Sequence, residues 1–179
     1  MAEKPYVIAI SAVSGGGKTT VTKCLAEQLP NSRALHFDDF NLRGPEDFAK
    51  WLDEGGDPHA WDLTPLVDAF STLCAESPEY VVLDYPFLYR HGQMRGFINL
   101  AVFVDTPLDI AMARRIIRDF EGRVIEDVIA EIQHYLSRAR PAYVDMLTTV
   151  KPTSDLIVDG TLPLSDIVKS IRERIAISI

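Results

Sequence analysis

The chain has 179 residues, 47% of them hydrophobic and 25% charged, which suits one soluble globular domain with its own core. Its formal net charge of −8 disfavours broad binding to nucleic acid or to an anionic membrane. No apolar run is long enough to span a membrane, and the N-terminus lacks a secretory pattern, so we expect a cytoplasmic protein. Cys24 and Cys74 lie far apart, which indicates neither a redox motif nor a zinc site.

The first expected elements are a strand over Tyr6–Ala12 and a helix over Lys18–Gln28, joined by a glycine-rich segment. In a phosphate-binding loop, glycines bring backbone N–H groups close to phosphate oxygens, a lysine reaches the β/γ-phosphates and a hydroxyl ligates Mg²⁺. The full pattern requires glycine where Ala12 stands, and an incidental glycine-rich turn is the alternative. The strand–loop–helix context favours nucleotide binding by Ser14, Gly15, Gly16, Gly17, Lys18, Thr19 and Thr20.

The remaining chain alternates between short apolar strands and helical patterns. Strands are expected at Arg33–Phe37, Tyr80–Asp84, Leu100–Val104 and Leu156–Val158. Helices are expected at Pro45–Asp53, Leu63–Ala75, Pro107–Phe120, Ile125–Leu147 and Leu164–Ile175, with Thr106 as a helix cap. This alternation predicts a three-layer α/β fold with a parallel sheet, as one domain over residues 1–179.

Acidic side chains follow two of the strands. Because ligands of open α/β sheets bind beyond the carboxyl ends of the strands, Asp38 and Asp84 should face the phosphate loop. We assign Asp38 as the base that takes the proton of an acceptor hydroxyl, and Asp84 as the metal partner of Thr19. For Asp39, hydrogen bonding within a local turn is an alternative to a functional role. For Asp84, the alternative is an ordinary aspartate in the turn that ends the strand.

The helix after the fourth strand carries several arginines. Arg114 and Arg118 are four residues apart and share a face, while Arg115 points about 100° away around the helix. Gly122 and Arg123 interrupt the helix, which suggests a lid over residues 114–125 that closes on the transferred phosphate. A solvated face paired with nearby carboxylates is an equally good explanation for any single arginine.

Four segments in the same order resemble the uridine kinase-like branch of P-loop small-molecule kinases. They are Ser14–Thr20, Asp38–Phe40, Val102–Pro107 with Arg114–Asp119, and Arg138–Pro141 followed by Lys151–Thr153 and Asp155–Val158. The resemblance implies a five-stranded parallel sheet in a P-loop NTPase fold with an arginine-bearing lid. It also implies that Asp38, Lys18, Arg114 and Arg118 are catalytic and that Arg115 joins the nucleotide site.

The sequence departs from that branch in front of the third strand, where a hairpin common among the nucleoside kinases is missing. Asp84-Tyr-Pro86 also replaces the usual Glu-Gly pair, and Ala111 stands where an arginine is frequent. The acceptor therefore stays open. We expect it to contact Asp38, Phe40, His59, Tyr85, Arg90 and His91, and we expect Trp61 to serve packing.

Taken together, these features predict an ATP- and Mg²⁺-dependent kinase that phosphorylates a hydroxyl of a small metabolite. The partner expected is the small-molecule acceptor, with neither nucleic acid nor membrane, and assembly into a homo-oligomer is left open. A nucleotide-dependent switch is an alternative, although the chain has no Asn-Lys-x-Asp segment for guanine recognition. A kinase that acts on a phosphate acceptor is a third reading, because its lid would look similar.

Overall fold

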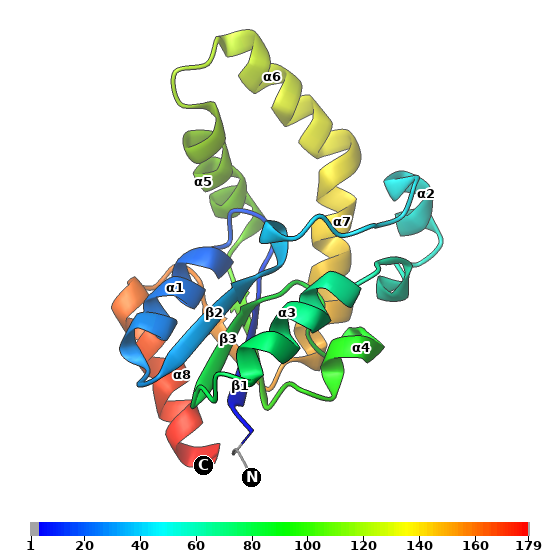
Figure 1. Ribbon diagram of the computed structural model, residues 1–179. Helices are drawn as coiled ribbons and strands as arrows, with labels where there is room; N and C mark the ends of the chain where they lie inside the picture. The colour runs from blue at the N-terminus through cyan, green and yellow to red at the C-terminus, as the bar shows by residue number, and fades with distance from the viewer. Residues whose placement is uncertain (1–3, 179) are drawn as a thin grey trace.

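A five-stranded, all-parallel sheet forms the centre of the computed structural model, which describes residues 4–178 (Figure 1). Its strands, in the spatial order β2-β3-β1-β4-β5, are β1 (Tyr6–Ser11), β2 (Ser32–His36), β3 (Tyr80–Asp84), β4 (Leu100–Asp105) and β5 (Leu156–Asp159). β1 lies in the middle, with Ile10 opposite Asp84 of β3 and Val102 of β4. The expected sheet is confirmed, and each strand lies within one or two residues of its predicted bounds.

Alternate residues of each central strand enter two separate hydrophobic cores. In β1, Val7 and Ala9 face one core while Ile8 and Ile10 face the other, as the two-residue period of a strand requires. Because both faces of the sheet are covered, these strands are formed by apolar runs that do not alternate with polar residues. Helices thus make the outer two layers of the predicted three-layer fold.

The helices lie close to their expected positions. They are α1 (Lys18–Gln28), α2 (Phe48–Asp53), α3 (Thr64–Cys74), α4 (Gly92–Arg95), α5 (Leu108–Phe120), α6 (Ile125–His134), α7 (Arg140–Asp145) and α8 (Leu164–Ser178). α1 and α8 cover one face of the sheet through residues such as Leu25 and Ile171, and α3 and α4 cover the other through Phe70 and Met94. The short helix α4 was not expected from the sequence. It begins after His91, whose side chain accepts a hydrogen bond from the Gln93 amide.

One long helix was expected over Ile125–Leu147, but the helical run from α6 to Thr153 contains two π-helical turns and ends in a 3₁₀ turn. The π turns cover Tyr135–Ala139 and Met146–Val150. Pro141 lies just after the first and has no N–H to donate to the preceding turn. The wider π turn lies where the regular series of backbone hydrogen bonds in the helix is interrupted, which is where such turns occur.

Thr106 does not cap α5, contrary to the expectation. Its buried hydroxyl donates a 2.9 Å hydrogen bond to the carbonyl oxygen of Gly16, ninety residues earlier in the chain. The N-cap position belongs to Pro107, without a side-chain hydrogen bond. The end of β4 is thereby tied directly to the glycine-rich segment after β1.

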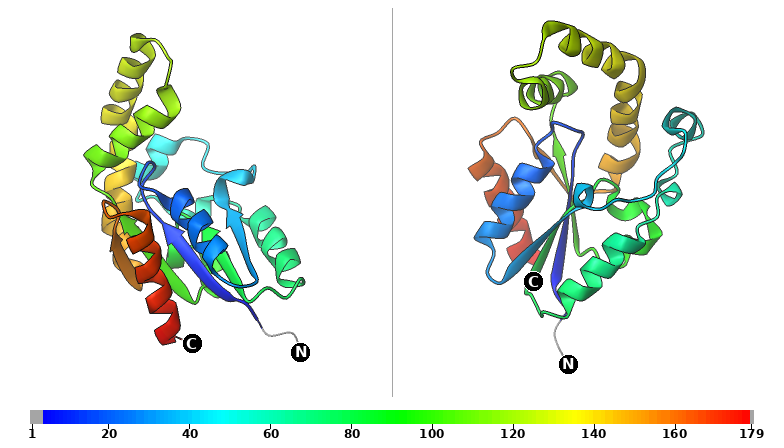
Figure 2. Two further views of the ribbon diagram at one scale, coloured as in Figure 1. Left: turned by 90° about the vertical axis from the view of Figure 1, so that its left-hand side faces the viewer. Right: turned by 45° about the horizontal axis from the view of Figure 1, so that its top comes forward.

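Helices α5 and α6 form a hairpin that rises from the body of the molecule, and α7 returns toward the body on the far side (Figures 1 and 2). Gly122 has a φ of 75° in the turn between the two helices, a backbone conformation that glycine adopts without strain. Within residues 4–178, no helix combines the length and the apolar character needed to cross a bilayer.

Candidate active site

A cavity of about 690 Å³ opens beyond the carboxyl ends of the strands. The segment between β1 and α1 lines its centre, as the sequence predicts. One end is lined by Arg114 and by the segment after β5, including Gly160 and Leu162. The other end lies between α2 and α7 and is lined by Phe37, Asp38, Phe48, Trp51, Leu52, Trp61, Phe87, Arg90, Tyr143, Asp145 and Met146.

The glycine-rich segment adopts a conformation that requires two of its glycines. Gly15 and Gly17 have φ values of 82° and 101°, in the left-handed region that L-residues with side chains rarely adopt. A Cβ on Gly15 would also lie 2.1 Å from the carbonyl oxygen of Ala111 in α5. All seven residues from Ser14 to Thr20 line the cavity, with α1 starting at Lys18. This arrangement points the N-terminus of α1 at the cavity, where its dipole favours an anion.

Lys18 and Thr19 meet the carboxylate of Asp84 at the end of β3. The Thr19 hydroxyl donates a 2.6 Å hydrogen bond to Asp84 Oδ2, and Lys18 Nζ forms an ion pair with Oδ1. Asp84 is buried, and His36 Nδ1 lies 3.3 Å from its Oδ2. Burial lowers the pKa of Lys18, an effect that the negative charge of Asp38 opposes. The three residues assigned to phosphate and metal therefore form one cluster.

Asp38 projects into the cavity from a 3₁₀ turn, Phe37–Asp39, that directly follows β2. The turn separates the two neighbouring carboxylates, since Asp38 lines the cavity and Asp39 does not. Asp38 thus shares one cavity with the glycine-rich loop.

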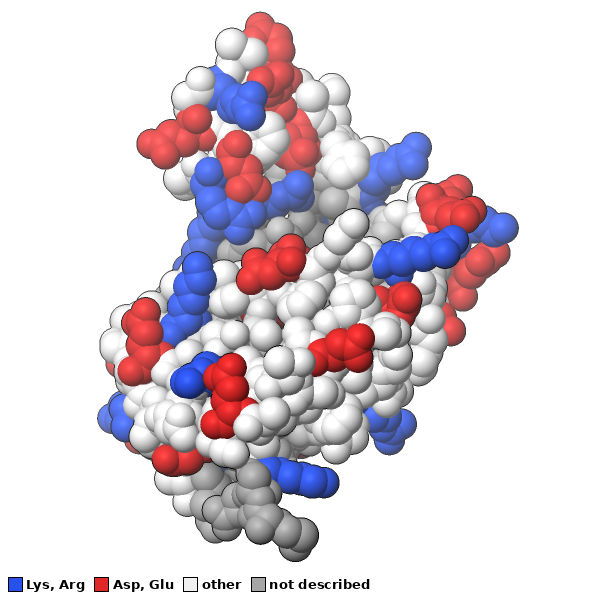
Figure 3. All heavy atoms as spheres, in the orientation of Figure 1, with Lys and Arg blue, Asp and Glu red and all other residues white. Residues whose placement is uncertain are grey.

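The arginines of α5 have different surroundings. Arg114 and Arg118 line the cavity; Arg114 donates to the Gly160 carbonyl at 3.1 Å, while Arg118 forms two hydrogen bonds with Asp119, of 2.6 and 2.8 Å. That contact raises the pKa of Arg118 and lowers the pKa of Asp119. Basic side chains gather where the hairpin meets the body, and acidic ones dominate its outer end (Figure 3).

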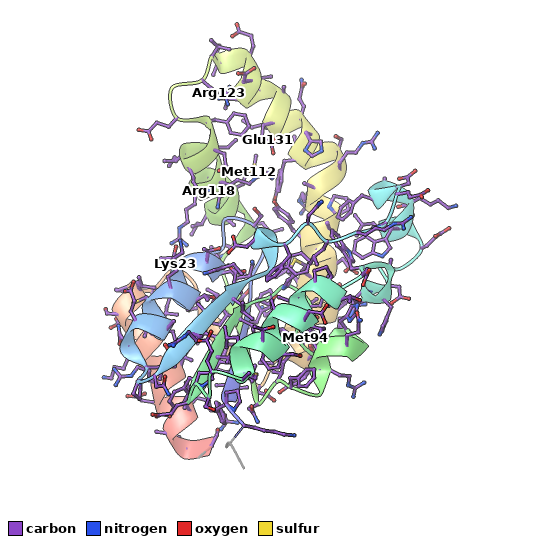
Figure 4. The ribbon with its side chains drawn as sticks, in the orientation of Figure 1. Lys23, Met94, Met112, Arg118, Arg123 and Glu131 are labelled. Atoms are coloured by element: carbon purple, nitrogen blue, oxygen red, sulfur yellow. The ribbon has the colours of Figure 1, made fainter. Side chains whose placement is uncertain are left out.

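Arg115 instead connects the two arms of the hairpin. It pairs with Glu131 of α6 at 2.6 Å and donates to the Tyr143 hydroxyl of α7 at 3.0 Å. Glu131 lies across the hairpin from Arg118 of α5 (Figure 4). Arg115 is not among the residues that line the cavity, unlike Arg114 and Arg118, although its Cβ would lie 3.3 Å from a Cβ added to Gly15 of the glycine-rich segment.

Of the residues expected to contact the acceptor, the structure brings Asp38 and Arg90 to the cavity. It does not bring Phe40, His59, Tyr85 or His91 there. Tyr85 is fully buried in the core below the cavity, and burial raises its pKa. His91 is buried too, caps α4 and lies 3.1 Å from the Trp61 carbonyl oxygen, while the exposed His59 stacks on the His91 ring. Both histidines therefore hold the segment before α3 to α4.

Sequence reasoning missed most of the aromatic wall at the α2–α7 end. Phe37, Trp61 and Phe87 lie in one aromatic cluster, with ring centroids 5.6 to 6.0 Å apart. Trp61, expected to serve packing, does so and also lines the cavity. Opposite these residues, Asp145 of α7 lies 3.8 Å from Arg90, which donates to the Thr149 hydroxyl at 2.8 Å. No short-range signal marks this wall, because its members come from five separate segments.

The sequence profile of the Phosphoribulokinase / Uridine kinase family matches residues 76–167, slightly more than half of the chain. The chain belongs to this family. It is accordingly an ATP-dependent phosphotransferase that acts on a hydroxyl group, which disfavours both the nucleotide switch and the phosphate-acceptor kinase. The resemblance inferred from the sequence motifs is confirmed.

Curated relatives are similar to the chain over nearly its whole length. A uridine kinase from Ligilactobacillus salivarius is 28% identical over 184 residues, covering 87% of this chain and 85% of the relative. A uridine kinase from Anoxybacillus flavithermus is 27% identical, with 88% and 87% of the two chains covered.

Solved structures with a similar fold include a sugar kinase from Janibacter sp. HTCC2649, with a TM-score of 0.63 and 14% identity, covering 96% of this chain and 95% of that one. A gluconokinase from Sinorhizobium meliloti 1021 has a TM-score of 0.54 at 21% identity, with 98% of each chain covered. At these identities the likeness concerns the fold, and it confirms the predicted P-loop NTPase architecture.

Proposed function

We propose that the protein transfers the γ-phosphate of ATP, with Mg²⁺, to a hydroxyl of a small metabolite bound between α2 and α7. One observation carries this proposal: Asp38 and the glycine-rich loop line the same cavity. A carboxylate facing a phosphate-binding loop suits phosphoryl transfer to an acceptor held between them. A volume of about 690 Å³ suits a triphosphate with a small second ligand.

The nucleotide would lie along the glycine-rich loop, with its base toward Gly160 and Leu162. Backbone amides of Ser14–Thr20 at the N-terminus of α1 supply donors to the phosphate oxygens. Lys18 would exchange its ion pair with Asp84 for the β/γ-phosphates. Burial lowers the pKa of Lys18, and the negative charge of a bound phosphate would raise it again.

The donor set around Asp84 fits a magnesium ion. A buried carboxylate beside a threonine hydroxyl offers the oxygen ligands that Mg²⁺ prefers, and phosphate and water oxygens would complete its shell. Among residues 4–178, no three His, Cys, Asp or Glu side chains form a group that could hold a metal ion by themselves. When bound, the ion would neutralise charge that develops on the phosphates. Thr19 and Asp84 are the residues that would hold it.

Asp38 would act as the catalytic base. It accepts the proton of the acceptor hydroxyl as that oxygen bonds to the γ-phosphorus, while the bond from the γ-phosphorus to the β-bridging oxygen breaks and ADP leaves. Its place on a turn at the end of β2 holds the carboxylate on a rigid element.

Residues 114–125 would form the lid of this single domain. Arg114 and Arg118 face the cavity, so a small movement of α5 would bring their charges to the transferring phosphate. Arg118 would exchange its carboxylate partner Asp119 for phosphate oxygens. Arg115 holds α5 to α6 and α7, and we therefore give it a positioning role in place of direct nucleotide binding.

The acceptor end of the cavity combines aromatic faces with two polar groups. Trp51, Trp61 and Tyr143 offer flat apolar surface, while Arg90 and Asp145 offer a donor and an acceptor of hydrogen bonds. This wall suits a hydroxylated molecule that carries a planar group better than it suits a linear polyol. Uridine is the first acceptor to test, because the curated relatives are uridine kinases.

A screen of ADP release tests the proposal. Purified protein with ATP and Mg²⁺ is presented with uridine, other nucleosides, sugars and their phosphorylated forms. We expect release that depends on an acceptor with a free hydroxyl and that is lost in the Asp38→Asn variant. Release that is independent of every acceptor, or unchanged in Asp38→Asn, would contradict the proposed function.

A further inference from the structure

The hairpin of α5 and α6 exposes an unusual concentration of large apolar side chains. Six of the strongly exposed ones lie between residues 117 and 136, and each is between 41% and 71% exposed. They are Ile117, Val124, Ile125, Ile129, Ile132 and Leu136. Scattered exposed apolar residues are ordinary, but a contiguous set on one projecting element marks an interaction surface.

Four of these residues form a stripe along the hairpin's second arm, which we call the outer stripe: Ile125, Ile129, Ile132 and Leu136. At 100° per residue they lie within an arc of about 60°. Their spacing of four, three and four residues is that of a helix that packs along another helix.

Neither the hairpin nor the active site covers the outer stripe. The inner side of the arm packs through Tyr135 and Ala139 against residues such as Ala111 and Met112 of α5. No member of the stripe belongs to that core or lines the active-site cavity. The stripe is therefore available to a partner that reaches the hairpin from outside.

The charges at the two ends of the arm indicate which partner fits. Residues 121–127 hold three acidic side chains and one basic one, a net charge of −2, whereas residues 134–140 hold Arg138 and Arg140, a net charge of +2 with histidine neutral. Within residues 4–178, neither Glu126 nor Arg140 takes part in an ion pair. The acidic character of the outer end is visible at the top of the molecule in Figure 3.

We propose that the outer stripe pairs with the same stripe of a second copy of this chain, in antiparallel orientation. A two-fold axis across the middle of the arm would cover both stripes and place the acidic end of each beside the basic end of the other. A parallel arrangement would instead bring like charges together. The interface would join the lids of two copies, and its existence does not depend on the proposed reaction.

Sedimentation velocity over low micromolar to near-millimolar protein tests the pairing directly. We expect the 20.0 kDa chain to shift toward twice that mass as concentration rises. The variant Ile129→Lys/Leu136→Lys should raise the dimer dissociation constant by at least about ten-fold. The control Ala130→Lys adds a single lysine on another exposed face of the arm and should leave the dissociation constant unchanged.

Charge reversal tests the orientation. Glu126→Arg and Arg140→Glu should each weaken self-association, whereas an equal mixture of the two variants should form heterodimers, because every facing pair then has opposite charges. A chain that stays monomeric at every concentration would overturn the proposal. So would an Ala130→Lys variant that dissociates as readily as the stripe variant, or a mixture that fails to associate. A monomer in which the stripe variant changes only the KM for ATP would assign the stripe to closure on the chain's own body.

Discussion

The buried hydrogen bond from Thr106 to Gly16 gives a prediction that rests on the fold alone. Thr106→Val keeps the β-branched shape and removes the hydroxyl, which leaves the Gly16 carbonyl oxygen without the donor that lies 2.9 Å away. Thr106 is 1% exposed, so water cannot readily replace that donor. An unsatisfied buried acceptor costs about 1–3 kcal/mol. For a domain of this size, each 1 kcal/mol lowers the Tm by about 2–4 °C.

Thermal unfolding followed by circular dichroism measures this loss, with Thr106→Ser as the matched control because serine keeps the hydroxyl. We expect Thr106→Val to unfold about 4–8 °C below the wild type, for a mid-range loss of about 2 kcal/mol, and Thr106→Ser to stay closer to it. The affinity for ATP should fall as well, since the bond holds the glycine-rich loop to the end of β4. Equal Tm values for the valine and serine variants would refute the assignment of this hydroxyl.

Three further predictions concern the loop, the lid and pH. Gly15→Ala should weaken ATP binding by at least about ten-fold in calorimetry, because the added Cβ would meet a backbone carbonyl of α5. Gly17→Ala has a similar φ but open space around the added Cβ, so it should weaken ATP binding less. Equal losses of affinity in the two variants would exclude the clash. Arg118→Ala should lower kcat by about 10²–10³-fold with little change in ATP affinity. The control Arg123→Ala, in the adjoining turn, should keep a kcat near the wild-type value. A larger loss of kcat in Arg123→Ala than in Arg118→Ala would remove Arg118 from the transfer step. Burial lowers the pKa of His91 below its ordinary 6.5, so the unfolded chain binds the proton more readily and the free energy of unfolding should fall as the pH drops through about 6.5. His91→Asn, which retains a cap acceptor, should flatten this dependence in urea titrations, and an unchanged slope would contradict it.

The sequence predicts those parts of the site that depend on local pattern. The five short apolar runs of the sequence form the five strands. Asp38 and Asp84 follow or end two of them, at the carboxyl edge of the sheet where α/β proteins bind their ligands. The glycine-rich loop is likewise encoded over a few consecutive residues, since two positive φ values and a close approach to α5 require glycine.

The acceptor wall could not be predicted in the same way. Trp51, Trp61 and Tyr143 meet in space although they come from distant segments, and each alone reads as an ordinary packing residue. His91 and Tyr85 follow β3 and so resemble site residues. Both side chains are buried instead, and His91 contacts the segment before α3 through the Trp61 carbonyl oxygen. The partner of Arg115 was equally hidden, because Glu131 lies on the other arm of the hairpin.

In the proposed reaction, Asp38 takes the acceptor's proton beside a triphosphate held by the glycine-rich loop. The most direct test compares Asp38→Asn with the wild type in two assays on one preparation: acceptor-dependent ADP release, and calorimetric binding of ATP with Mg²⁺. We expect ADP release to fall by about 10²–10⁴-fold while the dissociation constant for ATP stays within a few-fold of the wild-type value. Release that persists in the variant, or ATP affinity that falls together with it, would contradict the claim.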